Sequence, residues 1–238
     1  MKRFFGMALA CASLAMVGAV VCSARSTDPA LIHARDAQDR GALQSLASAA
    51  REAAEKSPKD AEAQYRFALA ESIQAEVLLE VRDKGSAEKA ATEGVKAAER
   101  AIAINGNEAE YYRVLGTLCG QVIPANPIMG ALSYGKRAKE SIEKAKQMDP
   151  KSAEVWIADG VGNYYLPPSF GGGYETAIKS FKRALELEPN NAEAWLWMGL
   201  AQHRNKQDAE ARISFAKSMA LDPNRVWAKV QMDKLPPK

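Results

Sequence analysis

The sequence has few of the side chains that carry catalytic chemistry. Its 238 residues include two histidines, His33 and His203, and neither lies in a metal-binding spacing such as His-Glu-x-x-His. No Gly-x-Ser-x-Gly elbow is present. The glycines at 171–173 are not followed by the Lys-Ser/Thr pair of a phosphate-binding loop. The sequence therefore predicts a protein that is not an enzyme and that has no metal site and no cofactor.

The first 24 residues have the pattern of a secretory signal peptide. Lys2 and Arg3 form a positively charged start, residues 4–21 are apolar, and the Cys-Ser-Ala sequence at 22–24 offers small residues for a cleavage site. We expect cleavage after residue 24 and a periplasmic or secreted protein. One alternative is an uncleaved N-terminal anchor, because the apolar run is about 18 residues long. The other is an envelope lipoprotein through Cys22, although a branched valine precedes that cysteine.

After cleavage of residues 1–24, the charge of the chain argues against a nucleic-acid-binding protein, and its cysteine content argues against a disulfide-bonded one. That segment holds two of the 32 Lys and Arg residues and none of the 29 Asp and Glu residues, so the remaining net charge is +1. This balance does not point to nucleic acid as a partner, and we expect membrane association only if the chain is lipidated or uncleaved. Cys119 is then the one cysteine left, which excludes an intrachain disulfide. Its place on the apolar side of a predicted helix indicates an inert, buried thiol.

Two stretches near the C-terminus repeat one pattern, and the second copy occupies 34 residues, 192–225. The recurring positions are an aromatic residue, a glycine, then three spaced helix positions and a closing proline: Trp156, Gly160, Ala177, Phe181, Ala184 and Pro189 in the first copy, and Trp195, Gly199, Ala211, Phe215, Ser218 and Pro223 in the second. These spacings predict a helix-turn-helix unit. A unit this small cannot bury its own apolar face, so it must stack on neighbours.

The pattern can be followed backwards through the chain, with looser matches. It predicts a helical segment or degenerate repeat at 25–60, a lengthened repeat at 61–106, a repeat with an insertion at 107–151, another with an insertion at 152–191, the regular repeat at 192–225, and a capping helix and tail at 226–238. The insertions fall near 122–129 and 166–173. Their prolines and glycines cannot continue a helix, so we expect irregular connections there.

These residues resemble the tetratricopeptide repeat (TPR) family, whose pattern is aromatic, Leu, Gly, then Ala, Phe, Ala and a closing Pro. The first two units depart from it, with Ala98 and Ile142 in place of the Phe. The resemblance implies an all-α fold, a right-handed α-solenoid of helical hairpins with capping helices. The two successive breaks, the second with Tyr-Tyr-Leu-Pro-Pro at 164–168, are similar to an atypical TPR branch. That branch includes the TRAP-transporter-associated periplasmic component and the regulator of microtubule dynamics proteins.

In TPR proteins the first helix of each hairpin lines the concave face and meets the ligand. Carried over position by position, the resemblance implies these partner-binding residues: Tyr65, Leu69, Ile73, Arg113, Thr117, Gln121, Ile157, Val161, Tyr164, Tyr165, Leu196, Leu200, His203 and Arg204. Such a surface suits an extended peptide or an apolar ligand with an acidic group. The alternative is that several of the aromatic residues belong to the core. The TPR clamp for C-terminal carboxylates is not expected, because Thr117, Val161 and Leu200 stand where its Asn recurs.

The leading hypothesis is an exported, non-enzymatic scaffold that binds a protein or peptide in its concave groove. The alternative is a small-molecule or lipid-binding accessory component of an envelope transport system. Tyr165 and Arg204 occupy the same position in adjacent units, which predicts that they lie in neighbouring places on the inner face. The loop from Leu166 to Tyr174 could be either a rim of the site or a plain linker. The sequence identifies neither the partner nor the oligomeric state.

Overall fold

The computed structural model describes residues 28–237, and these form helices and connections without any β-strand. The helices are α1 (Pro29–Asp36), α2 (Arg40–Lys56), α3 (Ala61–Glu80), α4 (Lys84–Ile104), α5 (Ala109–Val122), α6 (Pro127–Gly130), α7 (Lys136–Met148), α8 (Ala153–Tyr165), α9 (Tyr174–Leu187), α10 (Ala192–Arg204), α11 (Asp208–Leu221) and α12 (Val226–Met232). The predicted all-α fold is confirmed. The expected signal peptide at 1–24 lies outside the described residues.

Helix boundaries follow from local sequence signals. Asp60, Asp83 and Ser152 cap α3, α4 and α8, because their side chains accept hydrogen bonds from backbone N–H groups of the first turn. A proline follows the end of several helices at a distance of two residues: Pro58 after α2, Pro150 after α7, Pro189 after α9 and Pro223 after α11. The residue before a proline avoids the helical conformation, so each proline sets the end of its unit.

The two clearest repeats share a hydrogen bond that the aromatic position explains. Trp156 Nε1 donates to the carbonyl oxygen of Pro150 at 2.9 Å, and Trp195 Nε1 donates to that of Pro189 at 2.9 Å. Each tryptophan therefore ties the first helix of its hairpin to the proline that closes the preceding unit. The aromatic residue and the proline recur together because they are bonded.

The recurring glycine has an equally direct reason. A Cβ on Gly160 would collide with the ring of Phe181, and one on Gly199 would lie 2.7 Å from Phe215. Each glycine lets the two helices of a hairpin approach so that the phenylalanine of the second helix fills the space. In the hairpin of α5 and α7, Ile142 takes the place of Phe and would meet a Cβ on Gly116 at 2.7 Å.

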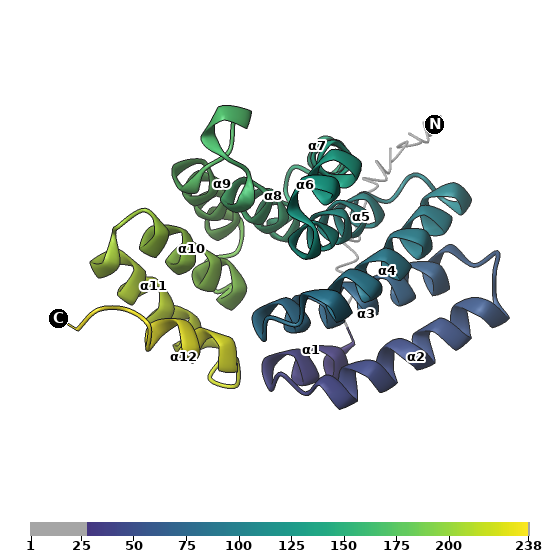
Figure 1. The fold of residues 1–238 in the computed structure, drawn as a ribbon, viewed down its shortest axis with the longest axis horizontal. Coiled ribbons are helices and arrows are strands. Elements are labelled where there is room, and N and C mark those ends of the chain that lie inside the picture. Colours follow the sequence, from purple (N-terminus) through teal and green to yellow (C-terminus); the bar gives the residue numbers. More distant parts are fainter. Residues whose placement is uncertain (1–27, 238) are drawn as a thin grey trace, which may run out of the picture.

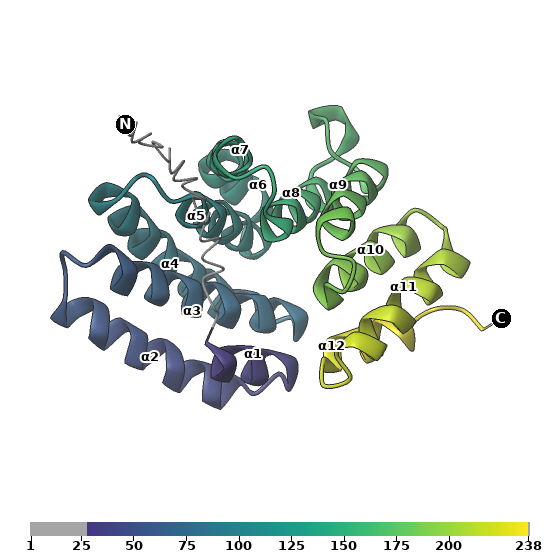
Figure 2. The same ribbon diagram turned by 180° about the vertical axis from the view of Figure 1, so that it is seen from behind.

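The hairpins stack side by side along a curved path (Figures 1 and 2). The hairpins are α3–α4, α5–α7, α8–α9 and α10–α11, preceded by the pair α1–α2 and closed by α12. In the C-terminal half, α8 and α10 lie toward the middle of the arc and α9 and α11 toward its outside (Figure 1). We call the side of α3, α5, α8 and α10 that is turned to the middle the inner face. The curvature brings α12 near α1.

The hydrophobic core is divided into two clusters of buried side chains. One extends from Leu31 to Val122 and holds α1 to α5 together, and the other extends from Ala153 to Leu235 across α8 to α12. α7 lies between them, packed against α5 and α8. The molecule therefore consists of two packed halves in succession, and contacts between the first and last helices must come from other side chains.

The two insertions are compact and not extended loops. The first forms a turn at Ile123–Ala125, the short helix α6 and a wide helical turn at Ala131–Gly135 that runs straight into α7. The second contains a helical turn at Pro168–Phe170 and then glycines, with φ of 87° at Gly171 and 105° at Gly173, values that favour glycine. None of the helices between residues 28 and 237 combines the length and the apolar character needed to cross a bilayer.

Candidate functional site

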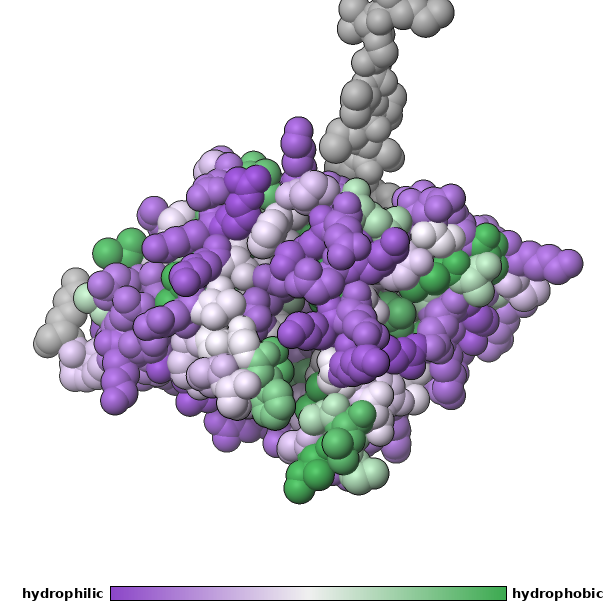
Figure 3. Space-filling model, turned by 90° about the horizontal axis from the view of Figure 1, so that it is seen from above, coloured by the Kyte–Doolittle hydropathy of each residue, from purple (hydrophilic) through white to green (hydrophobic). Residues whose placement is uncertain are grey.

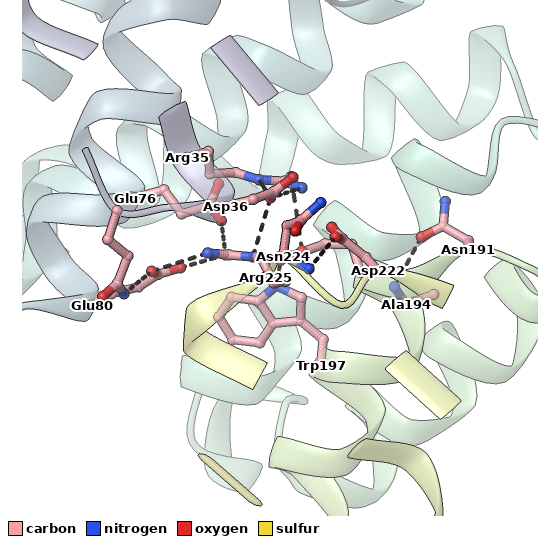
Figure 4. Close-up of polar contacts among 12 residues, drawn as sticks. Arg35, Asp36, Glu76, Glu80, Asn191, Ala194, Trp197, Asp222, Asn224 and Arg225 are labelled. Carbon is pink, nitrogen blue, oxygen red and sulfur yellow. Dashed lines mark hydrogen bonds and ion pairs between the residues drawn. The ribbon is translucent and has the colours of Figure 1, made fainter. Parts of the chain in front are cut away.

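The two ends of the arc meet at the side chain of Arg225, which precedes α12 and is 1% exposed. Its Nη2 donates to Glu76 Oε1 at 2.7 Å and its Nη1 donates to Glu80 Oε2 at 3.2 Å (Figure 4). Its Nε donates to Glu193 Oε2 at 3.3 Å. The guanidinium group therefore connects the C-terminal end of α3 with the N-terminal end of α10.

A second arginine extends this network to α1. Arg35 Nε donates to Asp36 Oδ1 at 2.9 Å, and its Nη1 lies 3.8 Å from Glu193 Oε2. Asp36 in turn lies 3.8 Å from Arg225 Nε. We call the group Arg35, Asp36, Glu76, Glu80, Glu193 and Arg225 the closure cluster (Figure 4). It joins side chains of the first half of the protein to side chains of the second.

The closure cluster holds more carboxylates than guanidinium groups. Burial and repulsion from Glu193 raise the pKa of Glu76 to about 8, although Arg225 and Arg35 oppose the shift. Burial also raises the pKa of Glu80, against the effect of Arg225. Glu76 and Glu80 therefore hold a proton more tightly than an exposed carboxylate does, whereas Arg225 and Arg35 lower the pKa of Glu193. The cluster can therefore respond to pH.

Aromatic side chains of three helices gather beside the closure cluster. The ring of Trp197 on α10 lies 5.8 Å from that of Tyr164, 6.3 Å from that of Tyr165 and 5.4 Å from that of Trp227. The guanidinium carbon of Arg225 lies 5.5 Å from the Trp227 ring centroid. The rings thus link the C-terminal end of α8 and the middle of α10 to α12.

The apolar candidates from the sequence are mostly core residues. Side chains with little exposed surface are Tyr65 at 4%, Leu69 at 8%, Ile73 at 6%, Ile157 at 6%, Leu196 at 0% and Leu200 at 7%. Val161 is half-buried against the second core cluster. These side chains belong to the two core clusters or pack against them, which is the alternative noted for the aromatic residues. Contact between any of them and a partner stays a prediction.

Most of the polar candidates are engaged in contacts within the protein. Arg113 Nε donates to Glu110 Oε2 at 2.7 Å, and Gln121 Nε2 donates to the Ser72 carbonyl at 3.0 Å. His203 Nδ1 lies 2.6 Å from Asp208 Oδ1 at the start of α11. Among the described residues, the buried Oγ1 of Thr117 has no hydrogen-bond partner. The Gln121 bond holds α5 against α3, the Arg113 bond lies within α5, and the His203–Asp208 contact fixes the turn between α10 and α11.

Tyr164, Tyr165 and Arg204 are the candidates that form a group. Arg204 Nε donates to Tyr164 Oη at 3.2 Å, so the arginine contacts the tyrosine that precedes the predicted one. Tyr165 packs edge-on against Tyr164, with ring centroids 4.8 Å apart, and is 66% exposed. Partial burial, the neighbouring Tyr164 and the carboxylates of Glu80 and Glu76 raise the pKa of Tyr165, and Arg204 lowers it. Tyr165 therefore lies within electrostatic range of the closure cluster.

The closure cluster was missed by the sequence analysis. Arg225 follows the closing proline of the last repeat, where the repeat pattern assigns no function, and its partners are far away in the chain. One signal was available. Glu76 and Glu80 stand one turn apart at the C-terminal end of α3, where the helix dipole disfavours negative charge. Two carboxylates at that end of a helix with many buried residues indicate that a cationic side chain from another part of the fold lies against them.

Comparisons with known families agree with the repeat pattern. The family described as Regulator of microtubule dynamics protein 1-3 matches residues 31–166, which is more than half of the chain. A TPR repeat family matches residues 171–206, and a tetratricopeptide repeat family matches residues 192–225. None of the curated proteins compared matches the chain. The resemblance to TPR proteins is confirmed.

Solved structures show the same fold at low sequence identity. The TPR protein TTC0263 of Thermus thermophilus has a TM-score of 0.64 and 18% identity, covering 82% of this chain and 91% of that chain. The HusA haemophore from Porphyromonas gingivalis has a TM-score of 0.53 and 17% identity, covering 84% of this chain and 95% of that chain. At these identities the likeness concerns the fold alone, which is the α-solenoid of TPR proteins.

Proposed function

The chain belongs to the regulator of microtubule dynamics protein 1-3 family, and from this starting point we propose that it is an exported, non-enzymatic scaffold that binds a protein or peptide segment on its inner face. The TPR fold is that of a protein-interaction scaffold. A solenoid exposes a long continuous surface in place of a deep catalytic pocket, so binding is the activity that the architecture favours. The family name refers to microtubule dynamics, and the function proposed for this chain does not include microtubule binding.

The exposed ring of Tyr165 is the observation that supports this proposal most. An aromatic side chain that is 66% exposed, in a cluster of otherwise packed rings, offers apolar contact area and a polar hydroxyl together. Arg204 is also exposed and is held in place by Tyr164, so its unused donors are available to a carboxylate or carbonyl group. Tyrosine and arginine are the residue types that most often carry binding energy at protein interfaces.

Co-purification from envelope extracts tests the proposal. We expect a stoichiometric protein partner whose retention falls several-fold with Tyr165→Ala or with Arg204→Ala, as about 1–2 kcal/mol of contact energy predicts. Ile213→Ala is the control, because this side chain is 58% exposed on α11, on the outside of the arc. If Arg204→Ala unfolds the protein, or leaves affinity for the identified partner unchanged, the binding site lies elsewhere.

The same purified protein distinguishes the alternative function. A metabolite or lipid bound in stoichiometric amount, detected by native mass spectrometry, would favour a ligand-binding accessory of an envelope transport system. The cluster of Tyr164, Tyr165 and Trp197 is the observation that favours this second candidate, since a group of aromatic rings also suits an apolar ligand. N-terminal sequencing of the protein from its host tests export, and we expect the mature chain to begin at Arg25. A chain that retains Met1 would indicate the anchored alternative.

A further inference from the structure

In the first insertion, several apolar side chains are exposed to solvent. The repeat pattern does not require apolar residues at these positions. Ile128 is 75% exposed, Met129 57% and Leu132 75%, all within α6 and the turn that follows it. Seen from above, most of the surface is hydrophilic, and hydrophobic residues form separate projecting groups (Figure 3). A cluster of large exposed apolar residues on a short projection marks an interaction surface.

The projection is held in a defined shape. Gly130 N donates to the Asn126 carbonyl at 2.7 Å, and the Asn126 side chain caps α6 by accepting from Met129 N at 3.4 Å. A Cβ on Gly130 would lie 2.8 Å from the Cα of Ile123, so the two arms of the insertion touch. Tyr134 packs against the N-terminal core. Backbone groups are thus satisfied within the insertion, which lowers the cost of placing it in an apolar medium.

The projection has no charged residues, whereas the helix that follows it has many. Residues 114–135 contain no charged side chain, whereas residues 136–146 contain five basic and two acidic residues. Of these, Arg137 pairs with Glu99, Lys146 pairs with Glu143 and Asp159, and Lys136 pairs with Glu140 at 3.6 Å with both side chains exposed. Lys139 is also exposed. The apolar tip is therefore followed directly by a basic helix, a local pattern that the net charge of the whole chain conceals.

We propose that the Ile128–Leu132 projection and the basic start of α7 form a docking site for an anionic membrane surface. The apolar side chains enter the boundary between headgroups and acyl chains, and the lysines contact the anionic headgroups. A protein partner fits less well, because a stable interface buries about 800 Å² on each side, and a few separate side chains on a narrow projection do not offer that area. This surface is distinct from the inner face, so the inference goes beyond the proposed function.

Vesicle co-sedimentation tests the proposal with the chain from Arg25 to Lys238, which contains every helix described. We expect binding to vesicles of equal parts phosphatidylcholine and phosphatidylglycerol, and little binding to phosphatidylcholine alone. The double variant Ile128→Ser and Leu132→Ser should weaken binding about tenfold, since both side chains lose their apolar area. Ile213→Ser is the matched control, because Ile213 is 58% exposed on α11 and should not matter.

Charge reversal and a position-specific probe complete the test. Lys136→Glu with Lys139→Glu should weaken binding about tenfold or more, whereas Lys179→Glu with Lys182→Glu on α9 should not. A fluorophore attached at Leu132→Cys should shift to the blue on addition of anionic vesicles, and one at Ile213→Cys should not. The proposal is overturned by absent vesicle binding, by equal loss in the controls, or by binding that ignores lipid charge. A dimer in solution that the Ile128 and Leu132 variants dissociate would overturn it in favour of a second copy.

Discussion

Arg225 and Glu80 are hydrogen-bonded although 145 residues separate them in the chain. The bond runs from the segment before the last helix to the end of α3, and it closes an arc whose hydrophobic core is divided into two halves. Apolar packing therefore holds neighbouring hairpins together, whereas ionic contacts hold the two ends of the arc together. Such contacts depend on pH and on geometry, so the closure is the part of the molecule most sensitive to single substitutions.

Removal of the Arg225 side chain should destabilise the protein strongly. Arg225→Ala leaves Glu80 and its neighbours buried without their cation, and breaking a buried ion pair in this way costs about 3–5 kcal/mol. Arg66→Ala is the control, because Arg66 is 73% exposed in a surface pair with Glu62 and should change stability by less than about 0.5 kcal/mol. Urea denaturation measures both. Equal midpoints for the two variants would show that the closure contributes nothing.

Stability should fall as pH rises from about 5 to about 8. Glu76 has a folded-state pKa of about 8 against an ordinary value of 4.5, so the folded state binds more protons across this interval and loses that advantage as pH rises. The slope is at most about 1.4 kcal/mol per pH unit for one group. Glu76→Gln should flatten it. Denaturation curves across the interval decide the matter, and a slope that the substitution leaves unchanged would refute the assignment to Glu76.

Two nearby glycines on α8 should respond in opposite ways to alanine. Gly160→Ala drives a Cβ against Phe181 and should cost about 1–3 kcal/mol. Gly162→Ala meets nothing within 4 Å and should stabilise the helix by up to about 1 kcal/mol. Gly199→Leu, in the next repeat, should cost about 1–3 kcal/mol because it meets Phe215. Thermal unfolding of the three variants provides the measurement, and destabilisation by Gly162→Ala would contradict this account of α8.

Cys119 should be unreactive in the folded protein. Burial raises the pKa of its thiol to about 12, so the thiolate that attacks disulfide reagents is scarce, and its side chain is 0% exposed. In the chain from Arg25 onward, an aromatic disulfide reagent should release no chromophore under native conditions and one equivalent in urea. Rapid reaction before unfolding would mean that α5 opens locally around this cysteine.

The positions of the helices could be predicted because their causes are local. The aromatic position, the small residue and the closing proline each act on residues within one hairpin or its immediate neighbour, as the bonds from Trp156 to Pro150 and from Trp195 to Pro189 illustrate. The prolines and glycines mark the two breaks in the repeat pattern, but the first break forms helical turns and a short helix where an irregular connection was expected. Helix length, capping and hairpin packing are all encoded within a few tens of residues, so a single sequence suffices to find them.

The candidate site was predicted less completely than the fold, since the exposure of its side chains depends on how the solenoid curves. The transferred TPR positions identified Tyr164, Tyr165 and Arg204, which do form a group, but also Leu196 and Ile157, which the tight stacking buries. Exposure along a solenoid depends on how closely successive hairpins approach. That distance is set by many side chains at once, and it cannot be read from any one repeat.

The sequence by itself determined the class of fold, because the repeated spacings and closing prolines act between neighbours in sequence. Only the tertiary structure decided that Arg225 meets Glu76, Glu80 and Glu193. A small rotation at each hairpin interface adds up along the arc, and the sum brings its ends together. The buried guanidinium group is then in contact with carboxylates from distant parts of the chain. No pattern within a single repeat predicts which residues form these pairs.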